Sequence, residues 1–332
     1  NSPTAYSLFS VYGYRNFSLD GSTGLTDQLF DQFIDPTIDL RMNPVINQKH
    51  MLRENIGRNT IINANLEYAI LKNLKLKITG GINSTITQNN QFNDTNTVYG
   101  NKRSLLGSQN GVNGSVMYYN SSTWVNENTL TWNKTFNRRH NFTVLAGMSE
   151  SVNKSSSHGS SATNLPNAQL GISGLDEGTP QVVRATSTSW GLMSFLGRAD
   201  YKYGNRYLLT FSYRADGSSK FAKHNRWGYF PSGAAAWKSS EEKFLKQFED
   251  ILSEGKLRVS YGLTGNNRVG DFTYLSAINL AVNPQGYTFG NTTISGAIPS
   301  NFGNENLTWE TTEQFNIGLD LAILRSRINL SV

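Results

Sequence analysis

Apolar side chains recur at every second position in several segments of this chain, and this alternation restricts the fold more than any other feature. In residues 61–70 the apolar positions alternate mainly with asparagine and glutamate, and in residues 74–82 leucine and isoleucine alternate with lysine and threonine. A period of two places alternate side chains on one face of a β-strand. The intervening Leu71 to Asn73 predicts a turn, so the two runs are expected to form a hairpin with one apolar face.

The same alternation returns along the rest of the sequence. One alternating run ends at residues 130–132. Further runs cover residues 142–148, 193–201, 209–215, 257–263 and 307–321. The last run is much longer than the ~5–6 residues of an average globular strand. Gly204-Asn205 separates two of the runs and is a hairpin turn signal. The sequence therefore predicts an all-β, antiparallel fold.

The connections between these runs alternate in length. Short ones fall near residues 71–73, 133–140, 203–206 and 322–326, and long polar ones near 15–57, 85–122, 151–188 and 264–306, with a shorter Gly/Ser segment at 217–228. In an up-and-down transmembrane β-barrel, short periplasmic turns lie at one rim and long extracellular loops at the other. Structureless connections this long would argue against the strands in a soluble domain. We therefore expect a transmembrane barrel.

Composition is compatible with that expectation. The mean hydropathy of -0.43 and the hydrophobic fraction of 37% look soluble, but barrel strands average lipid-facing with lumen-facing residues. No run reaches the ~20 apolar residues of a spanning helix. The absence of cysteine excludes disulfides and thiolate metal sites. The net charge of +6 comes from scattered residues, which does not predict a nucleic-acid partner.

One segment departs from the β pattern. Ser239 to Glu242 has the form of a helix capping box, and apolar residues follow at helical spacing from Phe244 to Leu252, before Gly255. This predicts one short amphipathic helix. Because the helix takes the place of a short connection between two predicted strands, we expect it on the periplasmic side.

Signals for catalysis are weak. The four histidines have no metal-binding spacing, and no nucleotide-binding or nucleophile-elbow motif occurs. Asp200 with Asp216, or Glu310 with Glu313, could be considered as a glycosidase acid and base, but lumen or rim carboxylates are the favoured interpretation. We expect no enzyme activity, no cofactor and no metal.

A more specific signal is the motif RADGSSKF at residues 214–221, followed by NRWGYFPS at residues 225–232. It resembles the corresponding stretch of SusC/RagA-like TonB-dependent transporters. The neighbouring segments GRADYKYGNRYLL, LRVSYGLTGNN (257–267) and NLTWETTEQF (306–315) resemble the flanking family pattern in the same order.

The resemblance implies a 22-stranded outer-membrane barrel with an N-terminal plug and a TonB box. It implies the partners of that family: a SusD-like surface lipoprotein, the TonB–ExbB–ExbD complex and outer-membrane lipid. The cargo would be oligosaccharides or peptides. On this interpretation residues 1–332 are part of a single barrel domain with about eleven strands, without the plug or the terminal strands, and energy coupling lies elsewhere.

The motif also supplies the candidate site residues. Asp216 is expected to accept backbone N–H bonds at a turn, Gly217 to adopt positive φ, and Phe221, Trp227 and Phe230 to pack the returning strand. A structural role at the outer rim is favoured over substrate contact. The rim candidates for substrate binding are Asp216, Ser218, Ser219, Asn225, Arg226, Trp227, Asn266 and Asn267.

Two alternatives remain open at this point. One is a soluble β-sandwich or barrel hydrolase that acts on polysaccharide, and the other is a passive porin or adhesin barrel. The first requires the apolar strand faces to pack beneath a second sheet, whereas a membrane barrel leaves them facing outward.

Overall fold

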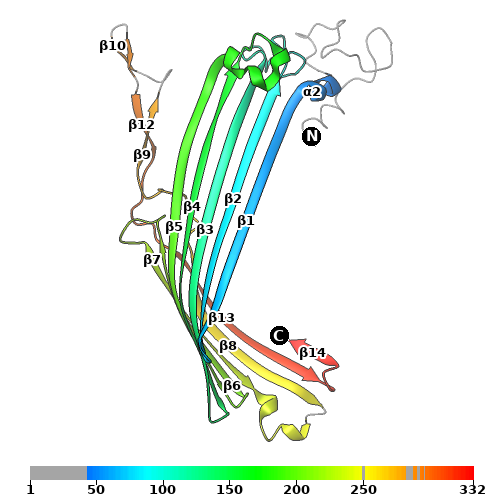
Figure 1. Cartoon of the computed structure of the whole chain (residues 1–332), viewed down its shortest axis with the longest axis vertical. Coiled ribbons are helices and arrows are strands. Elements are labelled where there is room, and N and C mark those ends of the chain that lie inside the picture. The colour runs from blue at the N-terminus through cyan, green and yellow to red at the C-terminus, as the bar shows by residue number, and fades with distance from the viewer. Residues whose placement is uncertain (1–42, 249–250, 282–286, 290–291, 295) are drawn as a thin grey trace. The chain divides into compact units, whose positions relative to one another are not determined.

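A computed structural model describes residues 43–248, 251–281, 287–289, 292–294 and 296–332. Ten strands form one sheet in the order β1-β2-β3-β4-β5-β6-β7-β8-β13-β14, and Figure 1 shows their course. The strands are β1 (Met51–Leu71), β2 (Leu74–Asn93), β3 (Asn113–Phe136), β4 (His140–Thr163), β5 (Thr179–Tyr203), β6 (Tyr207–Ser218), β7 (Trp227–Lys238), β8 (Leu252–Asn266), β13 (Glu310–Ile323) and β14 (Ile328–Ser331).

The remaining elements are short. Helix α2 (Pro44–His50) precedes β1, and the 3-10 segments are η1 (Ala168–Glu177), η2 (Ser239–Glu241) and η3 (Lys246–Phe248). Strand β9 (Ala277–Ala281) pairs with β12 (Gly296–Asn301), and β10 (Tyr287–Phe289) pairs with β11 (Thr292–Ile294). Among the described residues, no helix is long and apolar enough to cross a lipid bilayer.

The chain divides into two compact units. The described part of unit 1 comprises residues 43–60, 83–122 and 154–188, and unit 2 comprises residues 61–82, 123–153 and 189–332 where described. Strands β1 to β5 contribute to both units. The predicted fold class is confirmed, since the strands of the large sheet lie in chain order, with β13 next to β8 after the small hairpins, as expected for a barrel wall.

The short connections are confirmed as tight turns. Strand β1 ends at Leu71 and β2 begins at Leu74, and β13 is followed by β14 after four residues. Gly204 and Asn205 both have positive φ, of 53° and 62°, which is the backbone that a tight hairpin turn requires. The connection expected at 133–140 is shorter than predicted, because β3 continues to Phe136.

Two of the predicted loops are largely strand, and there the prediction was wrong. Within 85–122, β2 continues to Asn93 and β3 starts at Asn113; within 151–188, β4 continues to Thr163 and β5 starts at Thr179. Backbone hydrogen bonds hold strands together whether or not a face is apolar. A strand with water on both faces has no reason to alternate, so the sequence signal disappears while the pairing continues.

The other two long connections are shorter than predicted as well. Within 264–306, β8 extends to Asn266 and the two small hairpins follow. Most of 15–57 lies outside the described residues, but its last part forms α2 and the first residues of β1. The Gly/Ser connection expected at 217–228 is confined to residues 219–226.

The predicted amphipathic helix is replaced by the two 3-10 turns η2 and η3, and Leu252 already belongs to β8. The Glu242 side chain explains the difference, because it is not available as a helix cap. Its carboxylate accepts hydrogen bonds from Arg206 Nη1 at 2.9 Å, from the Tyr207 hydroxyl at 2.7 Å and from Trp237 Nε1 at 3.3 Å. Residues 249 and 250 lie outside the described part of this segment.

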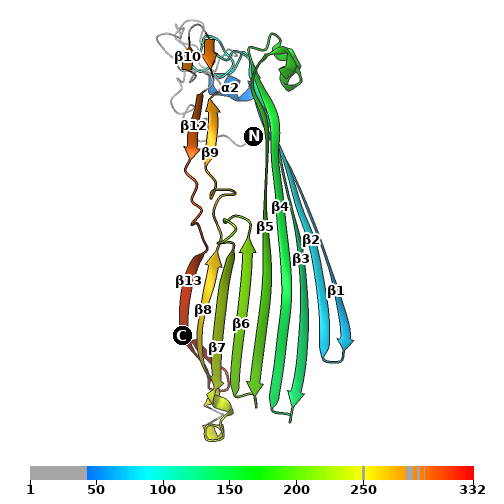
Figure 2. The same ribbon diagram turned by 90° about the vertical axis from the view of Figure 1, so that its left-hand side faces the viewer.

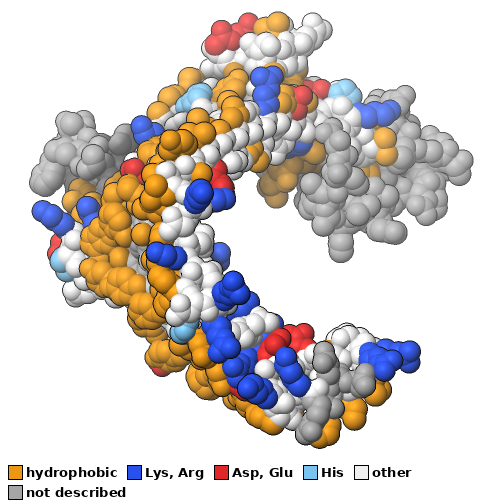
Figure 3. Space-filling model, turned by 60° about the horizontal axis from the view of Figure 1, so that its bottom comes forward, with side chains coloured by type: hydrophobic (Ala, Val, Ile, Leu, Met, Phe, Trp, Pro, Cys, Tyr) orange, Lys and Arg blue, Asp and Glu red, His pale blue; other side chains and the backbone are white. Residues whose placement is uncertain are grey.

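Unit 2 separates apolar from polar side chains between its two faces. The register sets Tyr201 opposite Leu209, Leu209 opposite Ala235, Ala235 opposite Val259 and Val259 opposite Ile317, so one apolar row crosses five strands. A parallel row contains Phe211, Gly233, Tyr261 and Phe315. Figure 2 shows these strands side by side, and Figure 3 shows hydrophobic side chains gathered along one side of the sheet and Lys and Arg along the other.

The polar face of unit 2 carries paired charges. Arg198 binds Asp200 through two contacts of 2.9 Å, and Arg258 binds Asp320 at 2.7 and 2.8 Å. On the apolar face, by contrast, Phe211 is 58% exposed and Ile317 66%. No described element covers these side chains, so the sandwich expectation fails. A continuous apolar face of this kind needs an apolar surrounding such as lipid.

Candidate functional site

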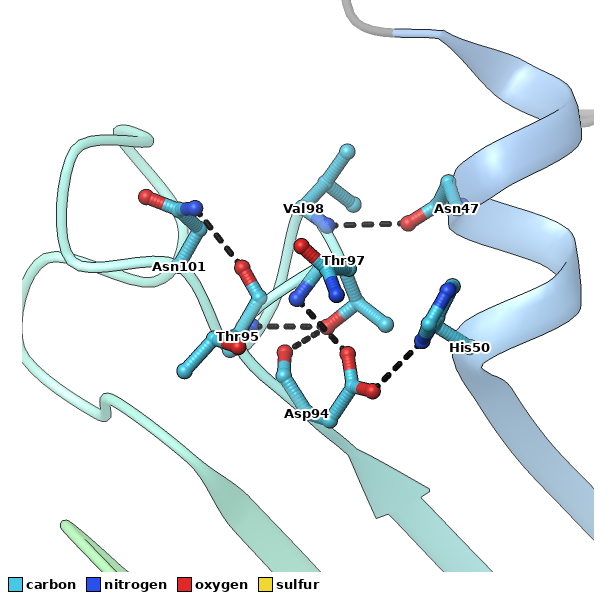
Figure 4. A network of polar contacts seen from close by, with 9 residues as sticks. Asn47, His50, Asp94, Thr95, Thr97, Val98 and Asn101 are labelled. Carbon is cyan, nitrogen blue, oxygen red and sulfur yellow. Dashed lines mark hydrogen bonds and ion pairs between the residues drawn. The ribbon is translucent and has the colours of Figure 1, made fainter. Parts of the chain in front are cut away.

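Unit 1 begins with a polar network that fixes α2 to the segment after β2 (Figure 4). Asn43 caps α2 by accepting bonds from two backbone N–H groups, as favoured N-cap residues do. Asn47 Oδ1 accepts the Val98 N–H at 2.8 Å, and His50 Nδ1 lies 2.7 Å from Asp94 Oδ2. Thr97 is fully buried beside them. The segment that follows β2 is therefore held as a defined structure.

A groove of about 400 Å³ crosses four strands of unit 1, and we call it the hydroxyl groove. Its lining residues are Thr85, Thr87, Tyr119, Asn120, Ser121, Ser155, Ser156, Ser157, Thr186, Ser187 and Thr188. All are uncharged, and every one except Asn120 carries a hydroxyl group. Sequence reasoning placed these residues in loops and singled out none of them, although their Ser/Thr-rich composition was the available signal.

Hydroxyl pairs connect the strands beneath the groove. Ser121 Oγ lies 3.1 Å from Ser155 Oγ, and Ser157 Oγ lies 2.6 Å from Thr186 Oγ1. Each hydroxyl can donate one hydrogen bond and accept two, so a paired hydroxyl keeps capacity for a ligand. Tyr119 is 38% exposed and offers an aromatic face. The groove can therefore bind a neutral, hydrogen-bonding chain, and nothing in its lining selects a charge.

The DGSS motif lies in unit 2 at the end of β6. Arg214 Nε donates to both oxygens of Asp216 at 2.7 and 2.8 Å, and Arg214 Nη2 donates to Ser194 Oγ at 3.0 Å. Asp216 and Ser194 are both buried. The expectation that Asp216 accepts backbone N–H bonds is corrected, since its partner is a guanidinium on its own strand.

The two serines of the motif join distant segments. The Ser218 N–H donates to the Arg226 carbonyl at 3.0 Å, and Asn267 Nδ2 donates to Ser218 Oγ at 3.2 Å. Ser219 exchanges two bonds with the Gly191 backbone, of 2.9 and 2.8 Å. We call this set of bonds the DGSS clasp. It brings together the end of β6, the start of β7, the segment after β8 and the middle of β5.

The remaining candidates also have partners within the chain. Asn225 Nδ2 donates to the Glu305 carbonyl at 3.1 Å, and Asn266 Nδ2 donates to Glu310 Oε2 at 2.8 Å. Trp309 Nε1 donates to the Arg226 carbonyl at 2.8 Å. Sequence reasoning did not select Trp309, although it lies in the family-like segment NLTWETTEQF.

Two of the three predicted packing residues lie in the core beside Trp309. Phe221 is fully buried and Phe230 is 7% exposed, with ring centroids 5.5 and 5.4 Å from Trp309. The third, Trp227, is 42% exposed and stacks on Phe195 at 6.0 Å. It packs against a strand face instead of in the core.

The role of Gly217 differs from the prediction, because its φ is not positive. A Cβ built at this position would lie 3.0 Å from three atoms of the Trp227 indole. The glycine is required for space, since the indole lies directly over its backbone. Only the register between β6 and β7, which pairs Gly217 with Trp227, reveals this.

In both proposed acid and base pairs, each carboxylate binds a different partner and not the other carboxylate. Asp200 and Asp216 bind different arginines, Glu310 binds Asn266, and Glu313 accepts the Tyr261 hydroxyl at 2.7 Å. Among the described residues, no three His, Asp or Glu side chains come together as metal ligands. Whether any rim candidate contacts substrate stays a prediction.

The comparisons with known proteins agree with this architecture. Residues 2–332 match the family described as TonB dependent receptor-like, beta-barrel. TonB-dependent receptor P3 of Formosa agariphila is 32% identical over 265 residues, which cover 80% of this chain and 25% of that protein. TonB-dependent receptor SusC of Bacteroides thetaiotaomicron is 48% identical over 145 residues, covering 43% of this chain and 14% of that protein.

Among solved structures, the RagAB peptide transporter has a similar fold, with a TM-score of 0.79, 22% identity and coverage of 96% of this chain and 33% of that one. The chain thus spans about a quarter of curated relatives and a third of this structure. TonB-dependent receptors are transport proteins and not enzymes, which removes the hydrolase alternative. The chain belongs to the TonB-dependent receptor β-barrel family, is SusC/RagA-like, and forms part of the barrel wall of an outer-membrane receptor.

Proposed function

We propose that the protein to which this wall belongs actively imports oligosaccharides or peptides across the outer membrane. The hydroxyl groove is the observation that carries the proposal, because a wide, uncharged and hydrogen-bonding surface suits both kinds of chain. The description of one similar structure, a peptide transporter, supports import of peptides.

The partners follow from the same similarity. Because the chain is similar to SusC and to the RagAB peptide transporter, we propose a SusD-like surface lipoprotein as its partner. Energy would come from the TonB–ExbB–ExbD complex, through parts of the protein that this chain does not contribute. The wall described above would supply contacts to cargo, and the DGSS clasp would hold the loops that surround the entrance. Trp227 stacks on Phe195 and belongs to the apolar rows, so we do not include it. The other rim candidates are proposed to contact cargo only through atoms that the clasp leaves free.

Uptake by the full-length protein tests the transport proposal. Fluorescent oligosaccharides and peptides of graded length should accumulate in cells that carry the protein, and dissipation of the proton gradient should abolish accumulation. Uptake that continues without the gradient would favour the passive porin, and surface binding without any uptake would favour the adhesin.

The groove itself is tested by binding. Tyr119→Ala removes the aromatic face, and the double variant Ser157→Ala with Thr186→Val removes one hydroxyl pair at nearly constant volume. Each should weaken binding of the imported cargo by about tenfold, the effect of ~1.4 kcal/mol. Tyr68→Ala is the matched control, because it removes an exposed tyrosine of β1 that lies outside the groove. Unaltered binding in both groove variants would contradict the proposal.

A further inference from the structure

The short connections of unit 2 differ in charge from the rest of the chain. Four of them, with the strand residues next to them, occupy residues 72–73, 134–139, 202–206 and 324–327, and we call these four the basic turns. They contain eight Lys and Arg residues and no Asp or Glu, whereas the net charge of the whole chain is only +6. The fifth connection, between β7 and β8, carries charges of both signs. The eight cations are Lys72, Lys134, Arg138, Arg139, Lys202, Arg206, Arg325 and Arg327.

Backbone hydrogen bonds join neighbouring turns to each other. The Gly204 N–H donates to the Arg139 carbonyl at 2.7 Å, and the Lys238 N–H donates to the Arg206 carbonyl at 2.7 Å. Figure 2 shows the short connections together at the lower end of the sheet. Turns of neighbouring hairpins lie two strand spacings apart, ~10 Å, which is about one Debye length at 0.1 M salt. The positive potentials of neighbouring turns therefore add.

The turn between β3 and β4 holds two exposed cations that the chain does not neutralise. Arg138 and Arg139 are adjacent and exposed, and within the described part of the chain neither forms an ion pair. Arg206, by contrast, binds Glu242 at 2.9 Å. Two adjacent like charges repel each other, so Arg138 and Arg139 add repulsion to the folded state without an internal partner to offset it.

The backbone of the basic turns does not favour arginine either. Arg138 has a φ of 54°, and Arg325 in the turn between β13 and β14 has a φ of 57°. This left-handed region suits glycine and asparagine and is costly for residues with longer side chains. Two long cationic side chains thus occupy positions where glycine would fold more easily. Unfavourable backbone of this kind points to a role outside the fold.

The basic turns lie on the periplasmic side, since short turns of such barrels face the periplasm. An aromatic cluster marks the membrane boundary just before the turn: Phe136 packs edge to face on Phe142 at 5.8 Å, and Phe142 lies 4.7 Å from Tyr201. Aromatic belts of this kind sit at headgroup level. Arg138 follows Phe136 by two residues at the tip of the turn, so its side chain extends past the headgroups into the periplasm.

We propose that the basic turns bind the carboxylates of peptidoglycan, the polymer that lies beneath the outer membrane. Single ion pairs in water contribute little, whereas several pairs formed at once with one polymer reinforce each other. A row of fixed cations therefore suits a polymer with repeated carboxylates better than a single small anion. Acidic phospholipid of the inner leaflet is the competing partner. It is less favoured because its headgroups lie level with the aromatic cluster, while Arg138 and Arg139 lie at the tip of the turn.

The test is co-sedimentation of the full-length protein, in detergent, with purified peptidoglycan sacculi. Sacculi with methyl-esterified carboxylates are the matched probe, because esterification keeps the polymer and removes its charge. Esterification should weaken binding about tenfold, and binding to untreated sacculi should fall as the salt concentration rises. Equal binding to both preparations would overturn the proposal. So would displacement from sacculi by micelles that contain phosphatidylglycerol but not by those with phosphatidylcholine, which would assign the turns to acidic lipid.

Variants assign the binding to the turn between β3 and β4. The double variant Arg138→Gln with Arg139→Gln should lose about tenfold in affinity for untreated sacculi. Lys223→Gln with Arg268→Gln removes two exposed charges from connections at the long-loop end and should bind as the parent protein does. Heat-modifiable migration on gels establishes that each variant is folded. A folded double variant of Arg138 and Arg139 with full affinity would contradict the assignment.

A glycine variant separates binding from a structural role of the arginine. Arg138→Gly removes one charge and adopts positive φ freely, so it should lose about threefold in affinity and unfold in urea no more readily than the parent protein. Retained affinity together with lower stability would show that Arg138 serves the turn and not a partner.

Discussion

Strands β1 to β5 pass through both units, yet the two units have different sequence patterns on the same kind of backbone. In unit 2 apolar and polar residues alternate, and the apolar rows align from strand to strand. In unit 1, β4 and β5 continue through mainly polar residues, many of them serine and threonine, without the regular alternation. The comparison shows that apolar and polar residues alternate where the two faces of a strand have different surroundings. Where the alternation stops, the strand itself can continue.

The largest expected effect tests the apolar face of unit 2. Phe211→Arg or Ile78→Arg places a charge in lipid near the midplane and should impair assembly by ~2–4 kcal/mol. Lys77→Arg should be nearly silent because the position already carries charge, and Ser157→Arg in unit 1 should cost far less than either lipid-facing variant because its position faces water. Folding yield in lipid vesicles, read by heat-modifiable migration, measures the difference. Equal effects in the two units would mean that the faces are assigned wrongly.

The next effect concerns the packing of glycine against tryptophan in unit 2. Gly217→Ala forces a Cβ against the Trp227 indole and should destabilise the barrel by ~1–3 kcal/mol, as overpacking does. The double variant with Trp227→Ala should recover most of this loss. Gly197→Ala is the control, because a Cβ there meets nothing within 4 Å. Urea unfolding of the full-length protein gives the comparison, and no recovery in the double variant would refute the steric explanation.

A smaller effect is expected for the hydroxyl pairs of unit 1. Ser157→Ala removes one partner of the 2.6 Å contact with Thr186, which lies at an exposed site where water can replace it. The stability cost should be ~0.5–1.5 kcal/mol or less, well below that of Phe211→Arg. Hydrogen exchange along β4 and β5 provides the measurement. A cost as large as that of a lipid-facing charge would show that unit 1 depends on its side-chain pairs and not on its backbone.

The smallest effect involves the turns of unit 2 at the short-connection end. Hydrogen bonds from the Tyr207 hydroxyl and from Arg206 lower the pKa of the Glu242 carboxyl. The contribution of Glu242 to the stability of these turns is therefore complete above the ordinary carboxyl pKa of ~4.3. It is lost as the pH falls through the lowered pKa. Hydrogen exchange in these turns should accelerate only below about pH 4. Glu242→Gln should remove this pH dependence, and an unchanged profile would rule out Glu242 as its source.

Sequence reasoning identified the parts of the fold that an apolar solvent imposes. The hairpin at Leu71 to Asn73, the Gly204-Asn205 turn and the apolar faces of single strands were all predictable, because each follows from local backbone rules or from burial in lipid. The strand extensions in unit 1 were not, since water on both faces leaves no periodic signal. The capping box at Ser239 failed as a predictor because the Glu242 side chain has stronger partners on a neighbouring turn, which are distant in sequence.

The candidate site shows the same division. The motif itself was found in the sequence, and the packing role of Phe221 and Phe230 was anticipated, although that of Trp227 in the core was not confirmed. The partners Asp216 with Arg214, Ser218 with Asn267 and Gly217 with Trp227 depend on strand register, which the sequence leaves open. The hydroxyl groove depends on four strands meeting at a common height, so no single segment could reveal it.

The DGSS clasp has a further consequence for how such a protein can change. Asn267 is bound to Ser218, and Trp309 is bound to the Arg226 carbonyl, so both ends of the intervening segment are attached to one fixed point. Doubling the length of a closed segment costs only ~0.6 kcal/mol of additional chain entropy. Insertions between these two anchors would therefore leave the wall intact, and descendants of one barrel could exchange this segment for another at little cost in stability.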